Sequence, residues 1–376
     1  LEASPTTAAQ SLEASPTTGT TIIGADWRRD CLTATSGNID QSAYILAAYA
    51  QHEQRVTVGR GFASATVGLR YNYHGDFGSH LTPKATLMYS LGPVNLRATY
   101  SAGFRAPGLD ELHYRYFSVN RGKAQVSFGN HDLKPEKSHY VALNAEWRIV
   151  GNASKRYRPE LVVSVTGFLN RVNDMVVKQN IDVDDATRRM LMGEFPEMTQ
   201  DQADKMVSYA LYQNSDKGDI KGIQANLSAN LLPGFSLSAN YAYAYARSLT
   251  VPAGDADGGE WQPLDRSIRH TATIAANWHH AFGKVYALNV NLNGRLQSST
   301  YYADPYENAP GFGIWNLYTT HTFTLRSSGG KVRSVEPGIG IDNLFDRADR
   351  RIDSSTRKYA LYSPGRMLVA GLKVNL

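Results

Sequence analysis

The stretch VNLRATYSAGFRAPGLDELHYRYF, residues 94–117, couples a regular pattern to an abrupt stop. Its first half alternates apolar and polar residues, which is the two-residue period of a β-strand with one dry and one wet face. The apolar positions are Val94, Leu96, Ala98, Tyr100, Ala102 and Phe104. Pro107 has no N–H to give to a ladder, so the strand ends there. A loop rich in His and Tyr follows.

The same alternation recurs along most of the chain. The predicted strands are long, many of about 12 to 18 residues, whereas soluble sheets average ~5–6. Short and long connections alternate, which is typical of outer-membrane barrels. The fold class is therefore all-β, an antiparallel transmembrane β-barrel with about fourteen strands present. They fall near 20–36, 42–57, 61–75, 80–91, 93–104, 136–149, 160–178, 207–231, 234–248, 266–282, 285–302, 312–326, 333–346 and 359–376.

Composition agrees with this interpretation. Apolar runs stay below 18 residues and the mean hydropathy is −0.37, as expected when lipid-facing and lumen-facing residues alternate. The net charge of +5 would suit a nucleic-acid binder, but no basic stripe or nucleic-acid motif accompanies it. We expect no nucleic-acid partner.

Enzyme signatures are missing from the sequence. It contains no GxSxG, HExxH, P-loop or GxGxxG motif, and its polar strand faces are rich in Asn, Ser, Gln and Thr. The sequence therefore predicts a protein that is not an enzyme, although an outer-membrane hydrolase stays as a minor hypothesis. A free-standing, fourteen-stranded passive porin is an alternative of a different class.

Two segments depart from the strand pattern. Residues 1–19 contain the heptad LEASPTT twice, eleven residues apart, which predicts a flexible or irregular lead-in. Residues 181–206 read as a loop with two short helices, the second capped by Thr199.

Several motifs together point to a known family. YSAGFRAPGLDELHYRYF followed by GNHDLKPEKSHYVALNAEW resembles the paired FRAP and NPDL elements of TonB-dependent outer-membrane receptors. The tail, GIGIDNLFDRADRR and then YALYSPGRMLVAGLKVNL, is similar to the closing strands of that family. The resemblance covers residues 20–376 and is carried by the order of the motifs.

This resemblance implies a 22-stranded barrel closed by an N-terminal plug in the bacterial outer membrane. Residues 20–376 would supply strands nine to twenty-two, with the plug and TonB box not in this chain. Implied partners are outer-membrane lipid, the TonB complex acting through the plug, and a surface lipoprotein that captures cargo. No intrinsic cofactor is implied. The cargo would be haem or another iron chelate, with cobalamin or a siderophore as the alternative.

The loop between the two motifs carries the candidate ligands. Haem receptors of this family carry an axial histidine there, and imidazole and phenolate both bind haem iron. His113, Tyr116 and His131 are therefore candidate iron ligands, and Tyr114 and Arg105 are candidate cargo contacts. The motif residues have either a structural role or a place in the ligand loop. They are Phe104, Ala106, Pro107, Asn130, Asp132 and Leu133.

Overall fold

The computed structural model describes residues 19–34, 39–120, 123–152, 157–250, 259–303, 309–326, 332–347, 350–353, 358–361 and 364–375. The predicted lead-in, apart from Gly19, lies outside these ranges. Gly19 itself is the first residue of strand β1 (Gly19–Ala34). Within the described residues, no helix is both long and apolar enough to cross a membrane.

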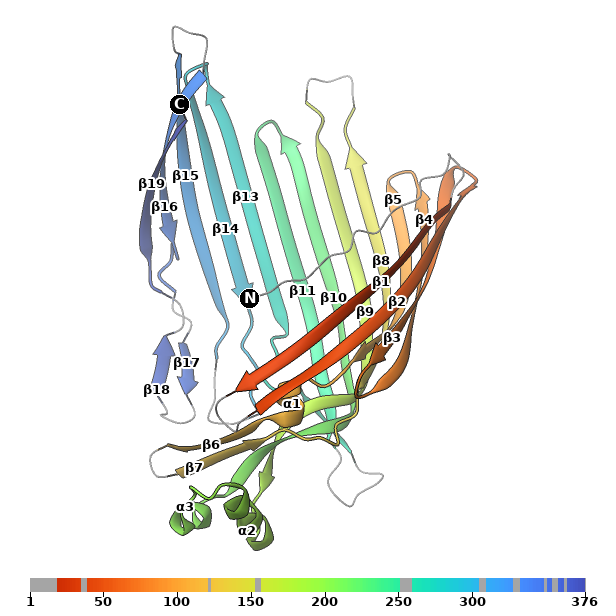
Figure 1. Ribbon diagram of the computed structural model, residues 1–376. Helices are drawn as coiled ribbons and strands as arrows, with labels where there is room; N and C mark the ends of the chain where they lie inside the picture. Colours follow the sequence, from red (N-terminus) through yellow and green to blue (C-terminus); the bar gives the residue numbers. More distant parts are fainter. Residues whose placement is uncertain are drawn as a thin grey trace.

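Fourteen long strands in the described part of the chain pair antiparallel with their sequence neighbours, which confirms the predicted fold class. Figure 1 shows them as one strongly curved sheet with β1 and β19 as its first and last long strands. After β1 they are β2 (Ile39–Val58), β3 (Gly61–His74), β4 (Gly78–Leu91), β5 (Val94–Arg105), β8 (Glu136–Val150), β9 (Glu160–Asp182), β10 (Ser208–Leu232), β11 (Phe235–Thr250), β13 (His270–Phe282), β14 (Tyr286–Gln297), β15 (Phe312–Arg326), β16 (Val332–Asp342) and β19 (Met367–Asn375).

The long connections contain structure of their own. The loop after β5 holds helix α1 (Leu109–His113) and a hairpin of β6 (Arg115–Asn120) and β7 (Lys123–Phe128). Short strands β12 (Glu260–Pro263), β17 (Arg350–Asp353) and β18 (Lys358–Leu361) follow further along. The last strand was predicted to begin at 359, which is wrong. Residues 358–361 pair with β17 in a separate hairpin, and β19 begins at Met367.

The ladders fix which residues share a face. On one face, apolar residues fill every second position of 141–149 in β8, 161–169 in β9 and 223–231 in β10. Each stretch has nine residues, the length that a tilted strand needs to cross a bilayer. Many of these side chains are exposed, including Leu143, Trp147 and Ile223. We call this the outward face, because it presents apolar surface that only lipid can cover favourably.

The two loops after β5 and β9 share a small core. Helix α2 (Asp185–Glu194) and helix α3 (Gln200–Asp204) pack against the β6–β7 hairpin through buried apolar side chains. Leu191, at 1% exposure, is the most buried of the larger ones. The predicted cap is confirmed, since the Thr199 hydroxyl accepts from the Gln202 amide at 3.3 Å. The shared core holds the two loops together beyond the same end of the sheet (Figure 1).

Candidate functional site at the loop end of the sheet

Arg105, the last residue of β5, ties the base of the long loop together. Its Nε and Nη2 donate to Glu136 at 2.8 and 2.7 Å, and its Nη1 donates to Glu111 at 2.9 Å. Glu136 also accepts the amide of Val176 at 2.8 Å, and Glu111 accepts that of Gly108 at 2.8 Å. One guanidinium therefore joins β5, α1, β8 and, through Glu136, β9. This geometry favours a structural role over the predicted cargo contact.

The charge state of this cluster is firmly set. Burial alone would raise the pKa of Glu136, but hydrogen bonds from Arg105 and from the Val176 amide outweigh it and hold the pKa below its ordinary value. Hydrogen bonds to Glu136 and Glu111 raise the pKa of Arg105, against burial. Arg105 and Glu136 therefore stay ionised at neutral pH and form a charged pair at the base of the loop.

The remaining FRAP residues pack at the base of the loop and do not extend away from it. Phe104 stacks on His80 with ring centroids 3.8 Å apart. Pro107 is buried, and with Ala106 it lines a cavity of about 340 Å³ that also contains Asn72 and His74. The structure places these residues at the base of the loop, where they set the path of the chain.

The NHDL residues also anchor the loop. Asn130 Nδ2 donates to the Tyr212 carbonyl at 3.0 Å, and its Oδ1 accepts the Asp132 amide at 2.9 Å, which makes a side-chain-to-backbone turn. The Asn130 amide donates to the Glu111 carbonyl at 2.9 Å. Leu133 is buried, and Asp132 is exposed. The segment therefore fastens α1 and the second motif to β10.

His113 and His131 come together in space. Their rings meet edge to face with centroids 4.6 Å apart, although 18 positions separate them in sequence. Burial and then the neighbouring His131 lower the pKa of His113. The pair closes the contact between the end of α1 and the turn that carries the second motif.

The lowered pKa predicts an acid-sensitive loop. The folded loop favours neutral His113, whereas the unfolded loop binds a proton near the ordinary value of 6.5, so stability is lost as pH falls below that value. Hydrogen exchange of residues 109–114 and 128–133 is expected to be faster at pH 5.5 than at pH 7.5 after correction for intrinsic rates. His113→Gln should flatten this dependence. Equal pH dependence in the two proteins would contradict the prediction.

Two tyrosines and a lysine form a second cluster. Tyr114 and Tyr116 stack with centroids 5.9 Å apart and planes 14° apart. Lys178 Nζ lies 5.5 Å from the ring centroids of both Tyr114 and Tyr212. In the described part of the chain no carboxylate forms an ion pair with Lys178, so its charge is shared only with aromatic faces. Burial, with Asp110 and Glu111 nearby, raises the pKa of Tyr212, which stays a neutral phenol.

This cluster borders a cavity of about 480 Å³ between the two loops. Lys205, held by Asp201 at 2.6 Å, brings a second ammonium group to it. The Ser127 hydroxyl is buried there and has no hydrogen-bond partner among the described residues. Aromatic rings, cations and an unsatisfied hydroxyl suit a planar, negatively charged ligand. We call it the loop cavity, lined also by Tyr116, Gln125, Asn180 and Tyr209.

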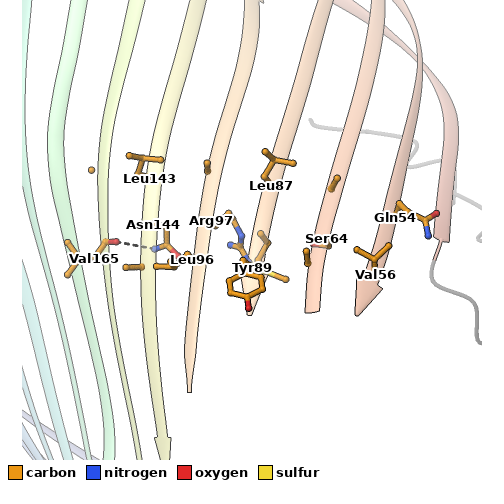
Figure 2. Close-up of a pocket in the computed structure, with 16 residues that line it drawn as sticks. Gln54, Val56, Ser64, Leu87, Tyr89, Leu96, Arg97, Leu143, Asn144 and Val165 are labelled. Carbon is orange, nitrogen blue, oxygen red and sulfur yellow. Dashed lines mark hydrogen bonds between the residues drawn. The ribbon is translucent and has the colours of Figure 1, made fainter. Parts of the chain in front are cut away.

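A different hollow lies on the outward face. It measures about 790 Å³ and spans β2 to β9, with alanine and glycine in its lining and Leu87, Leu143 and Val165 among its walls (Figure 2). Those walls belong to the apolar stretches that cross the membrane. Its position assigns this hollow to the lipid boundary rather than to cargo.

Comparison with known proteins matches this architecture. The family model for the TonB dependent receptor-like β-barrel covers residues 5–344. The chain belongs to the TonB-dependent receptor family. Receptors of this family are integral to the outer membrane, so the long strands cross that membrane and the long loops face outward.

Among curated TonB-dependent receptors, the ferric enterobactin receptor PirA of Pseudomonas aeruginosa is 25% identical over 365 residues. The match covers 92% of this chain but 43% of that receptor. Among solved structures, a mutant of the ferric enterobactin receptor PfeA of the same species, in complex with enterobactin, has a TM-score of 0.67. It is 18% identical, and the match covers 98% of this chain and 53% of that one.

A receptor for a different cargo shares the fold. The hemophore receptor HasR of Serratia marcescens, solved with its hemophore and heme, has a TM-score of 0.64 and 13% identity, covering 97% of this chain and 57% of HasR. The chain spans about half the length of the proteins it matches. At these identities the structural likeness establishes the barrel alone.

Part of the site was predictable from the sequence. His113, Tyr114, Tyr116 and His131 lie at the loop end as predicted, but they form two separate clusters. Lys178, Ser127 and Lys205 were missed. Lys178 could have been predicted, because it lies near the end of β9, which continues past the membrane to Asp182. No local signal marks the other two.

Proposed function

We propose that this chain forms the cargo-binding C-terminal strands of an outer-membrane receptor that captures and imports an iron chelate. The loop cavity carries the proposal, because it places stacked tyrosines and two ammonium groups on the side from which cargo arrives. The relatives named for ferric enterobactin support the same class of cargo. Binding followed by transport, rather than catalysis, accounts for this arrangement.

The cargo that best fits the loop cavity is a siderophore complex with aromatic, anionic iron-binding groups. Flat rings of such a ligand can stack on Tyr114 or Tyr116, and its negative charge is attracted by Lys178 and Lys205. The buried Ser127 hydroxyl provides a hydrogen bond that orients the ligand.

Haem is the second candidate, favoured by the meeting of His113 and His131. Imidazole is a common haem-iron ligand. However, the two rings pack against each other, so they would have to separate before both could bind one iron atom. The geometry therefore ranks a siderophore above haem, and Tyr116 above the histidines as a cargo contact. Nothing in the loop cavity favours cobalamin.

Replacement of Lys178 tests the cargo assignment. Lys178→Gln should raise the Kd for a ferric tris-catecholate by at least about tenfold, because it removes the cation that faces the rings of Tyr114 and Tyr212 beside the loop cavity. Lys134→Gln replaces an exposed lysine of the loop after β5 that does not line the loop cavity, so it is the matched control and should bind normally. Tryptophan fluorescence quenching measures each Kd.

Titrations with haem and cobalamin complete the experiment. A Soret shift that His113→Ala or His131→Ala abolishes, with no catecholate binding by the parent protein, would replace the siderophore assignment by haem. Binding of none of the three ligands by a folded receptor would contradict the proposed function.

The sheet edges support a larger barrel. In the described residues β1 pairs only with β2, and β19 only with β16. Unpaired strand edges are very costly in a bilayer, which supports closure of the sheet by further strands. We propose that these strands complete a 22-stranded barrel, with a plug that the TonB complex displaces, and that a surface lipoprotein delivers cargo. A closed barrel of these fourteen strands alone, with steady single-channel conductance, would instead support the passive porin.

A further inference from the structure

The outward face changes character at one place along its outer boundary. Within the first few rows beyond the nine-residue apolar stretches of β8, β9 and β10, basic side chains gather on the outward face, with His139 and Asp219 interspersed. The registers place Lys137, Arg171 and Lys217 within two neighbouring rows of the sheet, and Lys221 one row nearer the membrane. Arg269 joins them at the start of β13, where its guanidinium lies 4.9 Å from the Tyr245 ring centroid. We call these five residues the basic rim.

The cations of the basic rim are free to meet a ligand. All five side chains are exposed, and none forms an ion pair with a carboxylate in the described part of the chain. The acidic side chain within these rows, Asp219, is buried at 3% exposure and already accepts Arg247 at 2.7 Å. The rim therefore presents concentrated positive charge that this protein does not neutralise itself.

The height of the basic rim identifies what it meets. A nine-residue apolar stretch spans the hydrocarbon layer, so the next outward residues lie at the level of the lipid headgroups. Tyr245 stands between Lys221 and Arg269, 5.9 and 4.9 Å from their charges, in the position of an interfacial aromatic residue. The rim lies on the side of the long loops, which faces the outside of the cell.

The basic rim is local, which sets it apart from a general headgroup layer. On β3 the apolar outward stretch 63–71 is followed by Tyr73. One arginine stands at the corresponding position of β1, Arg29, and one directly before β19, Arg366, whereas five cations gather on β8 to β13. The concentration on β8 to β13 indicates a specific patch beside the strands that support the loop cavity.

We propose that the basic rim binds the phosphorylated headgroup of an outer-leaflet lipid, of the lipopolysaccharide type. Several phosphates on one headgroup match several exposed cations within a few rows of one sheet, and arginine binds phosphate through paired hydrogen bonds. The bound lipid would hold its acyl chains against the apolar stretches below and brace the strands from which the two cargo loops rise.

The triple variant Arg171→Gln, Lys217→Gln and Lys221→Gln tests this in the purified, detergent-solubilised receptor. Lipopolysaccharide binding, followed by native mass spectrometry, should weaken by about a hundredfold, since each cation at an anionic surface contributes roughly fivefold. The matched control, Arg60→Gln with Lys284→Gln, removes exposed cations at turns on the opposite membrane boundary and should keep parent affinity.

Two further binding measurements test the proposed lipid site. Lipid A stripped of its phosphates should bind the parent as weakly as intact lipopolysaccharide binds the triple variant. Inorganic phosphate at millimolar concentration should not displace the lipid. Parent affinity in a folded triple variant, equal loss in the turn control, or full displacement by inorganic phosphate would each overturn the proposal. Cargo binding is measured separately, so the siderophore assignment stands or falls independently.

Discussion

Arg105→Ala is expected to detach the base of the cargo loop and to raise the Kd for cargo by at least about tenfold. Alanine leaves Glu111 and Glu136, at 17% and 16% side-chain exposure, facing each other without a cation. Leaving a partly buried charge unpaired costs about 2–4 kcal/mol. Because these carboxylates hold α1 and β8, the loop that presents Tyr114 and Tyr116 loses its fixed position.

Hydrogen exchange and cargo titration measure this effect together. Exchange of residues 106–135 should accelerate, while the membrane-spanning part of β9 stays protected. Arg105→Lys retains charge but cannot reach both carboxylates in the same way, so an intermediate result is expected. Adding Glu136→Gln to Arg105→Ala should restore part of the protection, since it removes one of the unpaired charges. Unchanged exchange and unchanged Kd in Arg105→Ala would refute the structural role of this arginine.

Gly234→Ala is expected to impair folding of the barrel severely. Gly234 forms the tight turn between β10 and β11 with φ of +75°, and a Cβ there would lie 2.0 Å from the backbone carbonyl oxygen of His279 in β13. The left-handed conformation costs a side-chain-bearing residue about 1–2 kcal/mol, and displacing packed backbone adds about as much or more. We expect a loss of about 3–5 kcal/mol.

Gly283→Ala separates the two causes. Gly283 has φ of +84° in the turn between β13 and β14, but nothing lies within 4 Å of its Cβ position. It should therefore show the conformational cost alone, about 1–2 kcal/mol. The folded fraction, read from the heat-dependent mobility shift on gels, should fall far more for Gly234→Ala. Equal losses in the two variants would show that the close approach to His279 is unimportant.

The strand pattern was predictable because it depends on local chemistry. A residue's side of the sheet follows from its position along the chain, and a bilayer demands an apolar residue at every second position. The end of β5 near Pro107 and the cap at Thr199 are equally local. The last strand was misplaced because residues 358–361 have a strand-like sequence, yet they pair with β17 in a loop hairpin.

The candidate site was only partly predictable because its two halves come from different loops. Tyr114 and Tyr116 lie after β5, whereas Lys178 is on β9 and Lys205 follows α3, and they meet only when the shared core around Leu191 packs. For Arg105 the sequence suggested a cargo contact. Its hydrogen bonds to Glu111 and Glu136 instead favour a structural role at the base of the loop.

For this protein, the alternation of residues by itself determined an outer-membrane sheet, its faces and the end at which the long loops lie. The tertiary structure decided which loop residues meet: His113 with His131, Lys178 with Tyr114 and Tyr212, and the basic rim across β8 to β13. The physical reason is that a strand's face is set by its immediate neighbours and its solvent, whereas contacts between loops depend on register and packing across residues far apart in the chain.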